Sequence, residues 1–485
     1  MKLAVSTSWH SIFFRLAALL LFANTAAAQP SLQKLIDETA AGGRVALGSG
    51  PYRGSVVLDK PVILDGRGEV TLDGEGKGTL ITIASDGAVV KNMLLVNSGD
   101  SHDRVDAAIR VNSSFNTIAG NRISNTLFGI DLQQAHNNRI VNNDISSKNV
   151  KLGIRGDGIR VWASHRNLFR KNKIHDSRDM VVWYSNDNLI EDNEGWNNRY
   201  SLHFMFAGGN RVRRNTYHHN TVGIFLMYSR DAVVERNSVS FSLGGTGVGI
   251  GLKESDNLTI QFNEIVYCST GLYFDLSPFQ PDQYNFVKAN KIGFNITGIG
   301  FNSTLPRNIF KGNAFIGNLE TVEVHANGTA AKSVWQGNFY DEYKGFDRDR
   351  NGYGDSPFYK RAYMDQLWMS DDWIRFFYGS PVIGMVNFLS RLAPITEPRL
   401  LFADHSPVFR SSEAVLLSDR NLSYAPPATG PARFAATEEE EEMDEESNVP
   451  ARFAATEDEE EEGEEETDDL TDRNSVDFNR YYLKQ

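Results

Sequence analysis

Asparagine recurs through the middle of the chain at intervals close to 22 residues, and this period constrains the fold more than any other feature. Asn193, Asn215 and Asn237 follow one another at an interval of 22. That period is well below that of a propeller blade or a helical-pair repeat, and it fits one coil of a β-solenoid. Residues at equal distances from each Asn should therefore stack on successive coils.

Most coils carry the same short motif, in which an apolar residue follows two positions after the asparagine. Copies begin at Asn116, Asn121, Asn138, Asn143, Asn167, Asn188, Asn210, Asn285 and Asn308, with weaker ones at Asn263 and Asn338. Amides stacked about 4.8 Å apart can form a hydrogen-bonded ladder along the axis. The predicted fold is an all-β, right-handed parallel β-helix of the pectate-lyase-like kind, with an N-terminal capping helix and a C-terminal helical segment. A β-sandwich is the alternative, disfavoured because hairpin signals are missing.

The chain divides into five expected segments. Residues 1–28 have the pattern of a signal peptide, because an apolar run is followed by Ala26, Ala27 and Ala28. An uncleaved anchor is the alternative for this segment. The other segments are a capping helix at 29–43, the β-helix at 44–345, an Asp-rich loop with amphipathic helices at 346–410 and an acidic tail at 411–485.

Charge and cysteine usage restrict the function classes. From Glu438 to Leu470 there are nineteen acidic residues and one basic residue, a net charge of −18 against −13 for the whole chain, which leaves the remainder at +5. A segment so acidic cannot bury apolar area, so we expect the tail to be disordered. We expect no nucleic acid among the partners. Cys268 is the only cysteine, so no intrachain disulfide can form.

Strand alternation places unusual side chains on the outside of two consecutive coils. Successive residues of a strand point to opposite faces, which puts His203 and Met205 outside in one coil and Phe225 and Met227 outside in the next. The same register predicts inward side chains at Leu202, Phe204, Phe206, Ile224, Leu226 and Tyr228. Coil by coil, the outward pairs are Arg160/Trp162, Val182/Tyr184, His203/Met205, Phe225/Met227, Gly251/Lys253 and Tyr273/Asp275.

An imidazole beside two thioethers is the donor set that Cu(I) prefers over Mg²⁺ or Ca²⁺. The sequence therefore suggests a copper site at His203, Met205 and Met227. The alternative is a hydrophobic patch that binds a partner or a sugar, because methionine often serves as adaptable packing.

A second candidate metal site follows the repeats. Asp347, Asp349, Asn351 and Asp355 resemble the oxygen-ligand half of a calcium loop, with Gly352 at its turn. Phe358 stands where the closing Glu is expected, so a tight turn without an ion is the alternative. No compact pair of carboxylates suited to glycan hydrolysis is evident, and no residue is assigned a catalytic role.

Several longer stretches resemble the NosD family of nitrous-oxide-reductase maturation proteins. They are R-Y-S-L-H-F-M-F-A, G-I-F-L-M-Y-S, G-N-F-Y-D-E-Y-K-G-F-D-R-D-R-N-G-Y-G-D-S-P-F-Y, D-Q-L-W and G-S-P-V-I-G-M-V-N-F-L-S-R-L-A-P, and the resemblance extends from about Leu32 to about Pro407. The β-helix repeats are weakly specific for this family, whereas the H-F-M-F-A stretch and the C-terminal segments are more specific.

The resemblance implies a periplasmic, non-enzymatic copper-binding protein that works with an ABC transporter permease and ATPase. Its copper would come from a lipoprotein chaperone and serve a client copper enzyme, with His203, Met205 and Met227 at matching motif positions. The residues Trp368, Trp373, Phe376 and Phe377 would dock on the permease, giving peripheral contact with the membrane. The Leu276–Tyr284 loop and the acidic tail depart from the family pattern, so a paralogue serving another metalloenzyme stays open. A carbohydrate-active or carbohydrate-binding β-helix is the alternative function.

Overall fold

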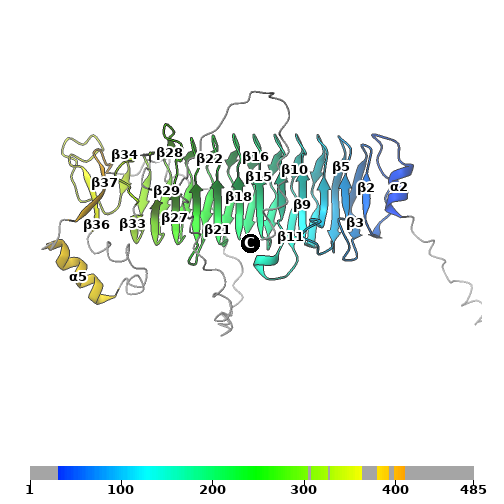
Figure 1. Cartoon of the computed structure of the whole chain (residues 1–485), viewed down its shortest axis with the longest axis horizontal. Coiled ribbons are helices and arrows are strands. Elements are labelled where there is room, and N and C mark those ends of the chain that lie inside the picture. Colours follow the sequence, from blue (N-terminus) through cyan, green and yellow to red (C-terminus); the bar gives the residue numbers. More distant parts are fainter. Residues whose placement is uncertain (1–30, 304–306, 326–327, 363–379, 393–397, 410–485) are drawn as a thin grey trace, which may run out of the picture. The chain divides into compact units, whose positions relative to one another are not determined.

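A computed structural model describes residues 31–303, 307–325, 328–362, 380–392 and 398–409 (Figure 1). The expected signal peptide, the acidic tail and the docking residues Trp368, Trp373, Phe376 and Phe377 lie outside these residues, so what the sequence suggests for them stays a prediction. Within the described ranges, no helix is both long and apolar enough to span a bilayer.

The predicted right-handed parallel β-helix is confirmed, and two parallel sheets run along it. The small sheet has 12 strands, one from each coil. They are β2 (Val56–Leu58), β4 (Ile81–Ile83), β6 (Ala107–Val111), β9 (Phe128–Gln133), β12 (Ile159–Trp162), β15 (Asp179–Trp183), β18 (Tyr200–Met205), β21 (Val222–Met227), β24 (Val248–Lys253), β27 (Thr270–Asp275), β30 (Thr297–Asn302) and β33 (Glu320–Val324).

The large sheet has 23 strands, and most coils contribute two of them. They are β1 (Gly50–Arg53), β3 (Ile63–Asp73), β5 (Val89–Val96), β7 (Thr117–Ala119), β8 (Arg122–Thr126), β10 (Arg139–Val141), β11 (Asp144–Ser147), β13 (Leu168–Arg170), β14 (Lys173–His175), β16 (Leu189–Glu191), β17 (Glu194–Trp196), β19 (Arg211–Arg213), β20 (Thr216–His218), β22 (Val233–Glu235), β23 (Ser238–Ser240), β25 (Thr259–Gln261), β26 (Glu264–Val266), β28 (Asn285–Lys288), β29 (Lys291–Gly293), β31 (Asn308–Lys311), β32 (Ala314–Ile316), β34 (Val334–Gln336) and β35 (Phe339–Tyr340).

Helix α2 (Leu32–Glu38) packs on the first coil at the blue end of the ribbon in Figure 1. Its Leu32 and Ile36 are buried, and the side chain of Gln33 donates to the carbonyl of Val57 and accepts from its N–H. Because Val57 lies on the edge strand β2, this amide occupies backbone groups that would otherwise invite pairing with another chain.

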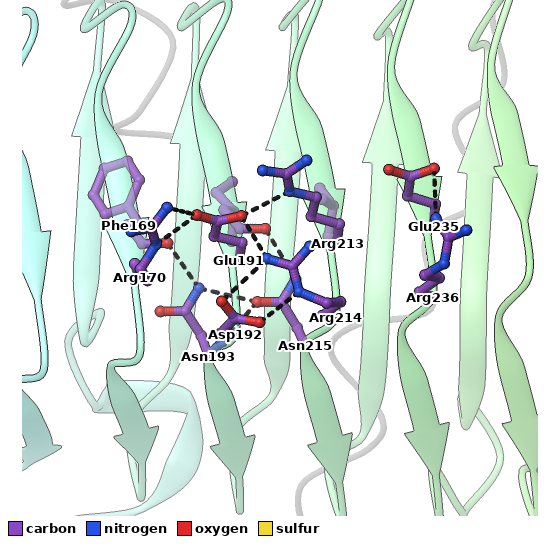
Figure 2. A network of polar contacts seen from close by, with 12 residues as sticks. Phe169, Arg170, Glu191, Asp192, Asn193, Arg213, Arg214, Asn215, Glu235 and Arg236 are labelled. Carbon is purple, nitrogen blue, oxygen red and sulfur yellow. Dashed lines mark hydrogen bonds and ion pairs between the residues drawn. The ribbon is translucent and has the colours of Figure 1, made fainter. Parts of the chain in front are cut away.

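The asparagines form two continuous ladders inside the corners of the coils. In Figure 2 the side-chain Nδ2 of Asn193 donates to Asn215 Oδ1 on the next coil and to the carbonyl of Phe169, each at 3.0 Å. One ladder joins Asn116, Asn138, Asn167, Asn188 and Asn210, and the other joins Asn121, Asn143, Asn172, Asn193, Asn215, Asn237, Asn263, Asn290, Asn313 and Asn338. Each buried amide thereby satisfies corner backbone groups that no strand pairs.

The core lies between the sheets, with one correction to the expected pattern. Leu202, Phe204 and Leu226 are fully buried, as predicted. Phe206 and Tyr228 do not point inward, because both have a positive φ of 52° that turns the chain at the end of the strand. The alternation stops at that corner, and Phe206 is 44% exposed.

An antiparallel hairpin follows the last coil and was not predicted. Its strands are β36 (Phe358–Ala362) and β37 (Arg399–Asp404). Phe402 stacks on Trp335 at 4.0 Å, and Phe358 stacks on Tyr340 at 4.1 Å, so the hairpin covers apolar rings of the final coil. Among the described residues, the remaining elements are a short 3₁₀ helix, Leu152–Ile154, and helix α5 (Pro381–Leu392).

Candidate metal centre on the small sheet

The strands β18 and β21 bring the predicted copper residues together. In their parallel register His203 pairs with Phe225 and Met205 pairs with Met227. The Nε2 atom of His203 lies 3.0 Å from the Sδ atom of Met227. An imidazole nitrogen and a thioether sulfur therefore converge from neighbouring coils, with Met205 directly beside Met227 on the same face.

The coil before β18 differs from the expected register. Trp183 and Val181, rather than Tyr184 and Val182, pair with Met205 and His203. Val182 points into the core. The coil from Asn172 to Asn193 has 21 residues instead of 22, and the register shifts between Asp179 and Val181. A one-residue shift exchanges the inner and outer faces, so counting from the asparagine selected the wrong pair.

His203 points away from the apolar core, but its neighbours cover it. Its side chain stacks on Tyr200 at 4.6 Å and meets Phe225 edge to face at 6.5 Å, and only 8% of the residue is exposed. Phe225 in turn lies over Gly251, where an added Cβ would come within 2.2 Å of its ring. Gly251 is thus required for the ring of Phe225 to keep this edge-to-face position beside the imidazole.

A buried carboxylate stands behind the imidazole. Asp179 Oδ2 lies 3.8 Å from His203 Nδ1, while Asp179 Oδ1 accepts from Arg199 Nε at 3.0 Å and from the N–H of Tyr200 at 3.2 Å. Burial alone would raise the pKa of Asp179, but the interactions with His203 and Arg199 outweigh it and hold the pKa below its usual range. An ionised Asp179 favours the proton on Nδ1, which leaves the lone pair of Nε2 directed toward Met227.

A second buried carboxylate, Asp157, lies behind Asp179. It accepts from Arg178 Nε at 3.0 Å. Burial, reinforced by the nearby charge of Asp179, raises the pKa of Asp157 to about 6 despite the opposing effect of Arg178. The two carboxyl groups therefore differ strongly in their affinity for a proton, and Asp179 is the one that stays ionised beside His203.

The donor set fits a soft monovalent ion better than a hard one. Across the part of the chain that the structure describes, no three His, Cys, Asp or Glu side chains gather as a metal cluster. At His203 the available donors are one imidazole nitrogen and the sulfurs of two half-buried methionines. Such donors suit Cu(I) and discriminate against Mg²⁺ and Ca²⁺.

An aromatic ladder borders this centre. Tyr184, Phe206 and Tyr228 stack on successive coils at 5.1 and 4.7 Å. Phe206 and Tyr228 also line a groove of about 930 Å³, to which the inserted Leu276–Tyr284 loop contributes Phe279. The rings face one another, so mainly their edges are presented to a ligand.

In the structure, the predicted calcium residues form a tight turn. Asp347 accepts the N–H groups of Asn351 and Gly352 at 3.1 and 3.0 Å, and Asp355 accepts the N–H of Arg348 at 2.7 Å. Asp349 likewise accepts from Asn351. Backbone amides therefore already bind the carboxylates that calcium would need, and calcium at this loop stays a prediction.

The most extensive carboxylate network on the large sheet is structural (Figure 2). Glu191 is fully buried and pairs with Arg170 of the preceding coil and with Arg213 and Arg214 of the following coil. Burial would raise the pKa of Glu191, but Arg213 and Arg170 lower it overall. A glycosidase needs a carboxyl group that keeps its proton, and Glu191 has the opposite tendency.

Sequence reasoning missed Asp179, Trp183, Tyr200 and Gly251 around the centre. The 21-residue spacing of Asn172 and Asn193 was the available signal for Trp183. Strand alternation placed Gly251 on the outward face but not its role, and no local pattern marks Asp179 or Tyr200, because these roles come from contacts between coils.

Comparison with known proteins identifies relatives of this chain. A family model described as "Periplasmic copper-binding protein (NosD)" matches residues 145–345, and one described as "Protein of unknown function (DUF1565)" matches residues 26–239. A probable ABC transporter binding protein NosD of Pseudomonas aeruginosa is 30% identical over 414 residues, covering 78% of this chain and 91% of the relative. Its counterpart in Stutzerimonas stutzeri is 25% identical over 411 residues, covering 78% and 89%.

Solved structures with a similar backbone include an epimerase module and a polysaccharide lyase. The A-module of the mannuronan C-5 epimerase AlgE4 of Azotobacter vinelandii has a TM-score of 0.44 and 16% identity, covering 61% of this chain and 92% of that one. A mannuronic acid specific polysaccharide family 6 lyase from human gut microbiota has a TM-score of 0.45 and 16% identity, covering 66% and 86%.

Proposed function

This chain belongs to the NosD family, and we propose that it is a periplasmic copper-binding accessory protein of an ABC transporter that serves the maturation of a copper enzyme of the nitrous oxide reductase type. The family model is described as periplasmic and copper-binding, and the relatives are named for binding an ABC transporter. In this proposal copper is the cargo, and the protein is a carrier rather than an enzyme.

The observation that carries the proposal is the 3.0 Å approach of His203 Nε2 to Met227 Sδ, with Met205 in register beside it. These are the three donors that the sequence suggested. The thioethers are half-buried at the outer face of the small sheet, so an ion held there can pass to a partner without crossing the core. His203, Met205 and Met227 would hold the ion.

The surroundings of His203 suit a carrier of Cu(I). Tyr200 and Phe225 cover the imidazole, which limits access of water on that side. Asp179 sets the orientation of the ring through Nδ1. A ring fixed in this way keeps Nε2 directed at the methionines, where its lone pair is available to an ion.

The partners in this proposal are a permease, an ATPase, a lipoprotein chaperone that supplies copper, and the client enzyme. Contact with the membrane would be peripheral, through the permease. Trp368, Trp373, Phe376 and Phe377 are the proposed docking residues. Helix α5 supports a docking role for this region, because one of its faces exposes apolar side chains at helical spacing, namely Val382, Met385, Phe388, Leu389 and Leu392.

A carbohydrate-binding or carbohydrate-active β-helix is the second candidate function. The groove beside Phe206, Tyr228 and Phe279 favours it. Sugars, however, stack on the open faces of aromatic rings, and in the ladder both faces of Phe206 are covered by Tyr184 and Tyr228. Turnover of a polyuronate by the purified protein would favour this candidate over the copper carrier.

Cu(I) titration under reducing conditions, with a chromophoric competitor, tests the proposal. Replacing both Met205 and Met227 with Leu should abolish Cu(I) binding while the circular dichroism spectrum is retained. Met180→Leu is the matched control, since Met180 is a fully buried methionine of the neighbouring strand β15. Equal Cu(I) affinity in the double variant and in the control would contradict the copper site.

A further inference from the structure

Two consecutive histidines on the large sheet approach each other through the same ring atom. His218 ends strand β20, and His219 follows it at the corner. Their Nδ1 atoms lie 3.0 Å apart, and their ring planes are nearly perpendicular at 87°. Neighbouring residues of a strand normally point to opposite faces, but the positive φ of His219, 55°, turns its ring back beside His218.

The separation of these two nitrogens matches a chelating pair. With metal–nitrogen bonds of about 2.0–2.1 Å, two donors at this distance subtend an angle of about 95° at a shared ion. That is the angle between adjacent ligands in square-planar or octahedral coordination, which Cu(II) and Ni(II) favour with nitrogen and oxygen donors. Tetrahedral coordination would need nitrogens farther apart.

Other contacts hold both rings in this orientation. His218 stacks on Trp196 with an interplanar angle of 5°, and His219 stacks on Phe241 at 4.8 Å. The second nitrogen of His218, Nε2, lies 3.7 Å from the carboxylate of Glu194. A carboxylate behind the non-coordinating nitrogen is the usual partner of a metal-bound histidine, because it fixes the tautomer that leaves the other nitrogen as a ligand.

A second histidine pair is stacked and lacks the chelating geometry. His136 and His165 stack at 5.1 Å with nearly parallel rings. The Nδ1 atom of His136 accepts the backbone N–H of His165 at 3.1 Å, and Nδ1 of His165 accepts the backbone N–H of Asn186 at 3.0 Å. The Nδ1 lone pairs of His136 and His165 accept backbone hydrogen bonds and are not available to a metal ion. This pair therefore serves as a comparison for His218 and His219.

We infer that His218 and His219 chelate one divalent transition-metal ion, with Cu(II) preferred over Ni(II), through their Nδ1 atoms. The described residues supply no third His, Cys, Asp or Glu ligand there, so water completes the coordination. The site is distinct from His203, which faces outward from the other sheet and offers soft donors. The inference does not depend on the proposed carrier function, because it rests on imidazole nitrogens alone.

Titration of the full chain with Ni(II), followed by calorimetry, tests the site directly. His219→Phe keeps an aromatic ring for the stack on Phe241 and removes one donor, and we expect the affinity to fall at least about tenfold. His165→Phe is the matched control and should bind as the unaltered chain does. Glu194→Gln should weaken binding about tenfold by releasing the orientation of His218.

Electron paramagnetic resonance with Cu(II) gives a second readout. In a chain that carries Met205→Leu and Met227→Leu, the spectrum should show coupling to two imidazole nitrogens, and His219→Phe should reduce this to one. Thermal melts verify that each variant is folded. Unchanged Ni(II) affinity in folded His219→Phe, or absence of Ni(II) binding to the unaltered chain, would overturn the inference and leave a pair that shares a proton.

Discussion

The Nε2 atom of His203 and the Sδ atom of Met227 lie 3.0 Å apart although 24 residues separate them in the chain. They meet because β18 and β21 are in register, with Met205 opposite Met227. A change that shifts either coil by one residue would send one of these side chains to the opposite face. The candidate copper site therefore depends on the coil register as much as on the residues themselves.

Removing the carboxylate behind His203 should weaken copper binding without removing a ligand. In Asp179→Asn the ring loses the charge that favours Nδ1 protonation, and we expect Cu(I) affinity to fall about 10- to 100-fold. Competition titration measures the change. Asp282→Asn, which removes a carboxylate from an exposed loop, is the control. If the affinity of Asp179→Asn equals that of the control, the carboxylate has no orienting role.

A methyl group at Gly251 should displace the ring of Phe225. The added Cβ would lie 2.2 Å from that ring. Gly251→Ala should therefore lower the free energy of unfolding by about 1 kcal/mol and expose His203. Adding Phe225→Leu should recover part of the loss, since the smaller side chain leaves room. A double-mutant cycle measured by chemical denaturation gives the coupling, and strictly additive effects would argue against this contact.

Asp404 should be essential for the C-terminal end of the β-helix. Its carboxylate accepts the N–H and the side-chain Nδ2 of Asn338 at 3.0 and 2.9 Å, and the N–H of Gly337 at 3.2 Å. Asp404→Ala leaves these buried donors without an acceptor, which should cost about 3 kcal/mol of stability. Asp282→Ala, in an exposed loop, is the control. Equal denaturation midpoints for the two variants would contradict the role of Asp404.

Because of Asp157, the free energy of unfolding should fall as the pH rises through weakly acidic values. Its pKa is raised from 3.8 to about 6 in the folded protein, so the folded state binds a proton that the unfolded state has already released. This contribution is present below about pH 4 and is lost between pH 4 and 6. Asp157→Asn should flatten the unfolding free energy over that window. An unaltered pH profile would show that Asp157 titrates normally.

The loop at Asp347 to Asp355 offers a direct test for calcium. If it binds an ion, Ca²⁺ should raise the melting temperature, and chelator should reverse the effect. Asp349→Asn should remove that response. The hydrogen bonds from Asn351 and Gly352 to Asp347 instead favour a turn that needs no ion, in which case chelator has no effect on melting.

Some features followed from the sequence because they are local and periodic. The asparagine interval predicted the parallel β-helix, and the pleat predicted that His203, Met205 and Met227 leave the core. Leu202, Phe204 and Leu226 are buried as that register requires. Both arguments hold where successive coils have the same length, because equivalent residues then stack on one another.

Local departures from the repeat limited the same reasoning. The 21-residue coil moved Trp183 into the place expected for Tyr184. The left-handed corners at Phe206 and Tyr228 turned outward two rings that alternation had placed inside. A period alone cannot show where one residue is missing or where a strand ends.

By itself, then, the sequence determined the repeat, the faces of the regular strands and the three soft donors on the small sheet. Only the tertiary structure decided what surrounds them: Asp179 behind His203, Gly251 beneath Phe225, and Asp404 closing a ladder on Asn338 66 residues earlier. The reason is physical. The periodicity of a strand can be read from neighbouring residues. Contacts between coils depend instead on the number of residues in every coil and turn that separates the two partners.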